Sequence, residues 1–97
     1  MHVISRRPLR EFARQHPDAE SSLQAWFYEA RQAHWRTTAD IKRHYGSASI
    51  LKGSRVVFNL CGNKYQLIVS INYRSEVVFV RFIGTHVEYD RVDAETI

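Results

Sequence analysis

RVVFNLCGNKYQLIVSINYRSEVVFVRFI, residues 55–83, contains three apolar runs that are rich in Val, Ile and Phe. The runs are residues 55–60, 65–72 and 77–83, and short segments of turn-forming residues separate them. Because connections this short join only antiparallel neighbours, the stretch predicts a three-stranded antiparallel meander. Polar and apolar residues alternate only partly along the runs, so we expect both faces of this sheet to be largely covered.

Helical periodicity dominates the residues before this stretch. After a short strand candidate at residues 2–5, Ser5 is expected to cap a helix that accepts Pro8 in its first turn. Asp18 is expected to cap a longer second helix, whose apolar positions recur at three- and four-residue spacing: Leu23, Trp26, Phe27, Ala30 and Ala33. A capping box at residues 37–40 predicts a third, short helix.

Together these elements predict an α+β fold in a single domain that spans residues 1–97. We expect a sheet of about four strands, two N-terminal helices packed on one face, and a short helical turn near the C-terminal end. With 44% apolar and 12% aromatic residues, the chain can bury a core. Its one cysteine excludes an internal disulfide, and no segment has the length of a signal peptide or a membrane-spanning helix, which predicts a cytoplasmic protein.

Positive charge is concentrated in the first half of the chain. Residues 1–55 hold ten Lys or Arg against five Asp or Glu, whereas residues 56–97 hold four against five. A basic helical layer favours a polyanionic partner, although an ordinary solvated helix surface is an equally good interpretation. Three aromatic residues in this half are candidates either for stacking on a ligand or for core packing: Trp26, Trp35 and Tyr45.

Arg81 lies within the last apolar run, among large apolar residues. Because side chains alternate along a strand, it is expected to share one face of the sheet with Phe79 and Ile83. A guanidinium cannot give up its charge, so it has to meet an anion. Two interpretations are open: an ion pair with Glu88, Asp90 or a helix carboxylate, or a fixed phosphate clamp on the open face of the sheet.

His86 follows that run after a short Gly-Thr turn. Thr85 is expected to cap a final helical turn, in which His86, Tyr89 and Asp90 share a face at i, i+3 and i+4. An imidazole can carry protons near neutral pH and a phenol can donate one, while a purely structural histidine is the alternative. The other histidines form no ligand pattern, so neither a metal site nor a cofactor is expected.

Polar residues also flank the turn between the first two apolar runs. Asn59 and Lys64 either support the turn or present hydrogen-bonding and charged groups to a ligand. Lys42, Lys52 and Arg55 are candidates for a basic rim that continues from there.

Two long segments, ILKGSRVVFNLCGNKYQLIVSINY and VVFVRFIGTHVEYDRVDAETI, resemble the HigB-type toxins of bacterial type II toxin–antitoxin modules, and MHVISRRPLREFARQHPDAESSLQAW matches their start. The most specific parts are F-N-x-x-G-N-K-Y at residues 58–65 and G-T-H-x-E-Y-D at residues 84–90. The resemblance implies a RelE-like fold, a twisted antiparallel sheet with two N-terminal helices. It also implies cleavage of messenger RNA, commonly on the translating ribosome, and neutralisation by a HigA antitoxin with a helix-turn-helix DNA-binding domain.

The resemblance implies a reaction in which the 2′-hydroxyl of the RNA attacks the adjacent phosphorus without a metal. Arg81 would stabilise the phosphate, and Lys64 would assist it or lower the pKa of the nucleophile. His86 and Tyr89 would carry or orient protons, with the acid and the base left unassigned. The candidate RNA contacts are Asn59, Lys42, Lys52 and Arg55. Gln66 stands where the family often has an arginine, which puts the strength of catalysis in doubt.

Two other functions remain open at this stage. One is a non-catalytic module that binds RNA or the ribosome, for which basic helices and aromatic residues suffice. The other is a protein-binding corepressor of a helix-turn-helix protein, which would contact DNA only through that partner. No membrane partner is expected.

Overall fold

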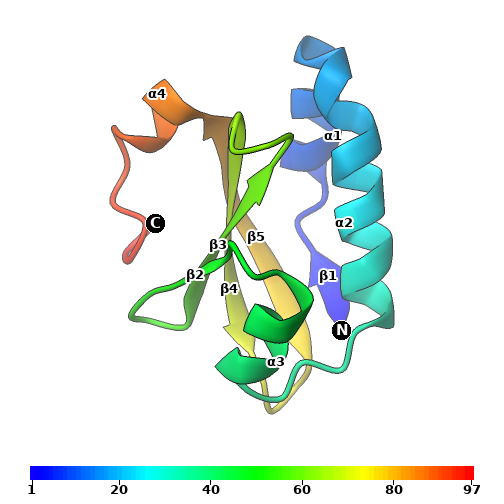
Figure 1. Ribbon diagram of the computed structural model, residues 1–97, viewed down its shortest axis with the longest axis vertical. Helices are drawn as coiled ribbons and strands as arrows, with labels where there is room; N and C mark the ends of the chain where they lie inside the picture. Colours follow the sequence, from blue (N-terminus) through cyan, green and yellow to red (C-terminus); the bar gives the residue numbers. More distant parts are fainter.

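A five-stranded sheet runs through the computed structural model, which describes residues 1–97 (Figure 1). Its strands are β1 (His2–Ile4), β2 (Ser49–Ile50), β3 (Arg55–Leu60), β4 (Tyr65–Asn72) and β5 (Val77–Thr85). The helices are α1 (Arg7–Gln15), the 3-10 turn η1 (Pro17–Ala19), α2 (Glu20–Gln32), α3 (Thr38–His44) and α4 (His86–Tyr89). None of the helices is long and apolar enough to cross a membrane.

The strand order β1-β5-β4-β3-β2 confirms the predicted meander and the α+β class. The sheet has five strands where we expected about four, because Ser49–Ile50, for which no strand was predicted, pairs with β3. It is also not antiparallel throughout, since β1 runs parallel to β5. A parallel neighbour is possible here because a long helical connection separates β1 from the strands of the meander.

Helices α1 and α2 cover one face of the sheet, as predicted (Figure 1). Trp26 on α2 is 1% exposed and lies edge-on to the ring of Phe58 on β3, with 5.5 Å between the centroids. The ring of Trp35 stacks on the same phenyl group at 5.8 Å. Both tryptophans therefore belong to the core and are not surfaces on which a ligand could stack.

The opposite face of the sheet is partly covered by the residues after α4. Figure 1 shows this segment, in orange to red, running beside the sheet on the side away from α1 and α2. Arg55 donates hydrogen bonds from Nε and Nη2 to the carbonyl oxygen of Ile97, at 3.0 and 2.6 Å. Val57 and Ile68, which face each other on this side, are 2% and 0% exposed. The partial alternation in the sequence thus corresponds to a sheet with two covered faces.

Of the expected helix caps, the local capping box is confirmed and the two single-residue caps are wrong. Thr37 and Asp40 form the predicted capping box of α3. Ser5 adopts a positive φ of 63°, and α1 begins after Arg6 without a side-chain cap. Helix α2 begins after Ala19, which leaves the carboxylate of Asp18, in η1, free for contacts outside the helix.

Candidate functional site

The last helical turn, α4, begins where β5 ends, and a capping box fixes it there. The backbone N–H of Glu88 donates to Oγ1 of Thr85 at 3.3 Å, and the N–H of Thr85 donates to Oε1 of Glu88 at 2.8 Å. The hydrogen bond that the backbone N–H of Thr85 donates to this carboxylate is the main cause that holds the pKa of Glu88 below its ordinary value. The expected cap at Thr85 is confirmed, and it orients α4 rigidly with respect to the strand.

Helix α4 brings two of the predicted proton carriers together. The rings of His86 and Tyr89 are nearly parallel, 18° apart, with 6.4 Å between their centroids. His86 is exposed and Tyr89 is half-buried. The N–H of Asp90 closes the turn on the carbonyl oxygen of His86 at 3.1 Å, but its carboxylate forms no hydrogen bond or ion pair with either ring. The pair that can take part in chemistry is therefore His86 and Tyr89.

Arg81 sits at a β-bulge, which the sequence analysis did not predict. The register of β4 and β5 shifts between Ile68 and Val69, whose partners are Phe82 and Val80, so Arg81 is the extra residue. The bulge makes one expectation wrong: Phe79 and Ile83 do not share a face. Ile83 packs against the core on the helix side, whereas Phe79 pairs with residue 70 on the other side.

The guanidinium of Arg81 lies on the face of the sheet away from the helices and is exposed. Its Nε donates to Oγ of Ser70 at 3.3 Å, and its Cζ lies 4.3 Å from the centroid of the Phe79 ring. No carboxylate lies within 4.0 Å of it, so the ion pair with Glu88, Asp90 or a helix carboxylate is not formed. The positive charge of Arg81 is available to an anion from outside the protein.

Lys64, in the turn between β3 and β4, is already paired. Its Nζ lies 2.6 Å from Oδ2 of Asp18 in η1. The hydroxyl of Tyr65 donates to the same carboxylate, at 2.8 Å to Oδ1 and 3.0 Å to Oδ2. Tyr65 is a core residue on the helix side of the sheet. Asp18 thus draws the ammonium of Lys64 toward the helices and away from the Arg81 face.

These contacts shift the pKa values of all three groups. The hydrogen bond from Lys64, followed by that from Tyr65, lowers the pKa of Asp18 below its ordinary value. The hydrogen bond and the charge of Asp18 raise the pKa of Lys64. Burial, and then the hydrogen bond to Asp18, raises the pKa of Tyr65. Lys64 therefore keeps its proton, and the carboxylate of Asp18 balances its positive charge.

Sequence reasoning gave no catalytic or binding role to Asp18, His16 or Tyr65. The imidazole of His16 stacks on Phe12 at 4.2 Å and is tilted toward the Tyr65 ring at 5.3 Å. It also attracts the carboxylate of Glu88, an effect smaller than that of the Thr85 hydrogen bonds. Asp18 and Lys64 are 46 residues apart, so no local pattern could have revealed their contact.

The predicted RNA contacts are mostly engaged in contacts within the protein. Lys42 donates to the carbonyl oxygens of Gly46 and Ala48, at 2.7 and 2.8 Å. Nδ2 of Asn59 donates to a loop carbonyl at 3.0 Å, and Arg55 binds the C-terminal segment. Lys52 alone is exposed and has no hydrogen-bond partner. No group of three or more His, Cys, Asp or Glu side chains is placed to hold a metal ion.

Comparison with known proteins identifies the family. The sequence profile of the HigB toxins, described as the RelE-like toxic component of a toxin–antitoxin system, matches residues 19–92. The chain belongs to the HigB toxin family. Two similar relatives are the mRNA interferase HigB of Escherichia coli O6:H1, 27% identical over 94 residues, and the mRNA interferase toxin HigB of Escherichia coli strain K12, 25% identical over 92 residues. The alignments cover 95% and 93% of this chain and 91% and 88% of the relatives.

Gln66, where the resemblance led us to expect an arginine, lies on the Arg81 face of the sheet. Gln66 pairs with Gly84, between the levels of Arg81 and His86 along the strands. Gln66 is 2% exposed; its Nε2 donates to the carbonyl oxygen of Asn63 at 2.9 Å, while its Oε1 has no hydrogen-bond partner. A buried, neutral amide therefore stands at this position and adds no positive charge to the face.

The HigB chain thus groups only part of the predicted catalytic set. His86 and Tyr89 are together, and Arg81 lies earlier on the strand that leads to them. Four residues of extended strand lie between Arg81 and His86, and the five steps along the backbone span about 16 Å. The unpaired guanidinium of Arg81 and the rings of His86 and Tyr89 thus lie on one continuous element, β5 and α4. Lys64 is bound to the carboxylate of Asp18.

Proposed function

We propose that the chain is an mRNA interferase: a metal-independent endoribonuclease that cleaves messenger RNA and so inhibits translation. Membership of the HigB toxin family and the names of the relatives support this proposal. The observation that carries it is Arg81, an exposed guanidinium without a carboxylate partner, on the strand that ends at the His86–Tyr89 turn. A phosphate is the anion that a planar, permanently charged guanidinium binds best.

In the proposed reaction, the 2′-hydroxyl of one nucleotide attacks the phosphorus that links it to the next. One group has to remove the proton of this hydroxyl and another has to donate a proton to the leaving 5′-oxygen, and His86 and Tyr89 take these two roles. Arg81 stabilises the negative charge that develops on the phosphorane. To reach it, the guanidinium leaves Ser70 and extends along β5 toward α4, since its present hydrogen bond is long at 3.3 Å.

Lys64 joins the reaction only when a phosphate competes with Asp18 for its ammonium. Both partners are exposed, with side-chain exposures of 61% and 48%, so solvent weakens the ion pair. A phosphate close to the turn between β3 and β4 can therefore displace the carboxylate. Lys52, which has no partner, and Asn59, Lys42 and Arg55 complete the proposed RNA-binding residues, although the last three first have to release contacts within the protein.

The proposed setting is the translating ribosome in the cytoplasm, where messenger RNA is presented as a single strand. The toxin–antitoxin family implies an antitoxin partner. We propose that this partner is a HigA-type protein with a helix-turn-helix domain, so that the toxin meets DNA only through it.

The decisive experiment maps cuts in a messenger RNA by primer extension after incubation with the protein in a translating extract. The wild-type protein is expected to cut, and the His86→Ala, Tyr89→Phe double variant to cut at least about a hundredfold more slowly. A matched control replaces the same residue types at exposed positions away from α4: His34→Ala, Tyr28→Phe. This control is expected to cut at the wild-type rate.

Each alternative function gives a different result. Translation inhibition without any cuts would indicate a non-catalytic RNA- or ribosome-binding module. Equal cutting by the double variant and the wild type would overturn the assignment of His86 and Tyr89. A protein that neither cuts RNA nor arrests growth when expressed without its partner would be a corepressor. Repeating the reaction on the same RNA without ribosomes determines whether cleavage requires the ribosome.

A further inference from the structure

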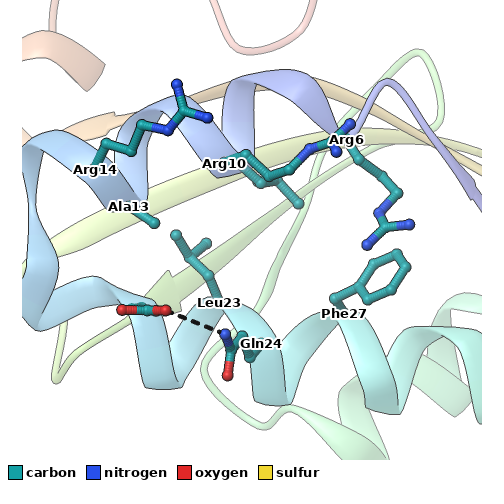
Figure 2. Close-up of a pocket in the computed structure, with 9 residues that line it drawn as sticks. Arg6, Arg10, Ala13, Arg14, Leu23, Gln24 and Phe27 are labelled. Atoms are coloured by element: carbon teal, nitrogen blue, oxygen red, sulfur yellow. Dashed lines mark hydrogen bonds between the residues drawn. The ribbon is translucent and has the colours of Figure 1, made fainter.

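A groove of about 350 Å³ lies between α1 and α2, in the helical layer (Figure 2). Its floor is apolar and is formed by side chains from both helices: Leu9, Ala13, Leu23 and Phe27. Leu9 and Leu23 are 7% and 4% exposed, so they form a continuous surface with the core. Neither the residues of α4 nor Arg81 line this groove, and it is therefore separate from the proposed RNA-cleavage site.

Three arginines stand along one wall of the groove. Arg6, Arg10 and Arg14 are spaced four residues apart, which places their charges over about 12 Å, or two helical turns. None of the three forms an ion pair, whereas their neighbour Arg7, outside the groove, pairs with Glu11 at 2.9 Å. In Figure 2 the guanidinium of Arg6 lies over the ring of Phe27, whereas that of Arg14 is turned away from α2. This wall carries a positive field that the protein does not neutralise itself.

The opposite wall carries one carboxylate, that of Glu20. Its Oε1 accepts a hydrogen bond from Gln24 at 3.3 Å and is not engaged with the arginines (Figure 2). Near the other end of the groove, the Cζ of Arg6 lies 3.9 Å from the centroid of the Phe27 ring. A second hollow of about 270 Å³ shares these two residues and adds Arg31. The two hollows adjoin at Arg6 and Phe27, and arginines line both of them.

We propose that this α1/α2 groove binds an acidic amphipathic helix of a partner protein. The apolar floor would bury the apolar face of such a helix, and carboxylates at four-residue spacing would meet Arg6, Arg10 and Arg14 in register. A strand of RNA also carries regularly spaced negative charge, but it gains little from Leu and Ala, and Glu20 would repel its phosphates. Phe27, the one aromatic ring of the floor, already has the guanidinium of Arg6 over it at 3.9 Å. The combination of floor and wall favours a protein helix.

If the proposed function is correct, this partner is the antitoxin. Only the identity of the partner rests on the proposed function, because the groove itself is described from its lining residues. Arg81 and the groove lie on opposite sides of the sheet, because α1 and α2 cover the face away from Arg81. A helix bound in the groove therefore leaves Arg81 uncovered. Binding at this site would hold the two proteins together without itself occupying the proposed cleavage site.

The test is selection from a displayed library of helical peptides on the full-length protein, followed by affinity measurement of the enriched peptides by fluorescence anisotropy. Enriched peptides are expected to carry Asp or Glu at four-residue spacing beside an apolar face. Their affinity is expected to fall at least about tenfold for Arg10→Glu, Arg14→Glu. The matched control is Arg36→Glu, Arg74→Glu, which changes the net charge equally at exposed positions outside the groove and is expected to change the affinity less than about twofold.

Enrichment of peptides without acidic residues, or equal affinity for the Arg10→Glu, Arg14→Glu variant and the wild type, would overturn the proposal. A short single-stranded RNA is titrated in parallel. If the affinity for this RNA fell in the Arg10→Glu, Arg14→Glu variant while the affinity for the peptides did not, the groove would be an RNA site and the proposal would be wrong. Peptide binding does not require catalysis, so a protein that fails to cleave messenger RNA can still bind the peptides in the groove. Equally, a protein that cleaves messenger RNA can fail to bind the peptides, so the two proposals are tested separately. Circular dichroism of each variant establishes that it is folded.

Discussion

Arg81 and Lys64 are two exposed cations of the same sheet, but their surroundings are opposite. Arg81 has a serine hydroxyl at 3.3 Å and an aromatic ring as its neighbours, and no carboxylate. Lys64 is 2.6 Å from a carboxylate that also accepts a hydrogen bond from a buried tyrosine. A phosphate can bind Arg81 without breaking an ion pair, whereas at Lys64 it has to replace Asp18. On the proposed function, we therefore expect Arg81 to bind the RNA first and Asp18 to limit the contribution of Lys64.

The largest effect is expected from the removal of Arg81. Arg81→Ala should lower the rate of RNA cleavage about a thousandfold, because Arg55, the other arginine on that face, is already engaged by the carbonyl oxygens of Gly53 and Ile97 and is not free to stabilise the phosphorane. Cleavage under single-turnover conditions measures this rate, and Arg74→Ala, in an exposed turn, serves as the matched control. Because Arg81 is exposed and its hydrogen bond is weak, the Tm should hardly change. A rate within a few-fold of the wild type would remove Arg81 from the proposed site.

A smaller effect is expected from the removal of Lys64. Lys64→Ala should lower the cleavage rate about tenfold, since Asp18 already neutralises much of the charge that is lost. The same single-turnover assay applies, with Arg74→Ala as the control for the loss of an exposed cation outside the proposed site. If Lys64→Ala were as severe as Arg81→Ala, the distinction between the two cations would be wrong.

Asp18→Asn is expected to strengthen RNA binding, whereas the removal of Arg81 or Lys64 weakens the reaction. Without the carboxylate, Lys64 is free to bind a phosphate, so the affinity for single-stranded RNA should rise about threefold. The logarithm of the binding constant should also fall more steeply with the logarithm of the salt concentration, by a slope of about 0.7 for one added phosphate contact. A purely structural role of the ion pair would leave this slope unchanged or weaken binding, so the salt titration separates the two interpretations.

The parts of the fold that depend on neighbours in sequence were predictable. Three apolar runs with short turns require a meander, and the capping boxes at Thr37 and Thr85 act over only four residues. The bulge at Arg81 was not predictable, because it depends on the register between β4 and β5 and not on the sequence of either strand alone. The pairing of Asp18 with Lys64 joins residues 46 apart, and only the packing of η1 beside the β3–β4 turn creates it. The sequence therefore offered Arg81 and His86 as candidates, whereas the ion pair that restrains Lys64 could not be predicted from it.

The smallest effect is expected on stability, and its pH dependence reports on the ion pair directly. The pKa of Asp18 is lowered from its ordinary value of 3.8, mainly by the hydrogen bond from Lys64. A carboxyl group whose pKa is lower in the folded than in the unfolded protein stabilises the fold above the unfolded value, and this contribution is lost as the pH falls through the folded value. Wild-type protein should therefore have a Tm a few degrees above that of Asp18→Asn at pH 5–7, and the two should converge below pH 3.8.

Thermal unfolding of both proteins across this pH range, followed by circular dichroism, measures the difference. Asp40 and Glu88 also have lowered pKa values, but both proteins contain them, so their contributions cancel when the two Tm curves are subtracted. A Tm difference that stayed constant down to pH 2 would show that Asp18 stabilises the fold as a neutral hydrogen-bond acceptor for Tyr65. Lys64 would then be as available to RNA as Arg81, and the contrast between the two cations would disappear.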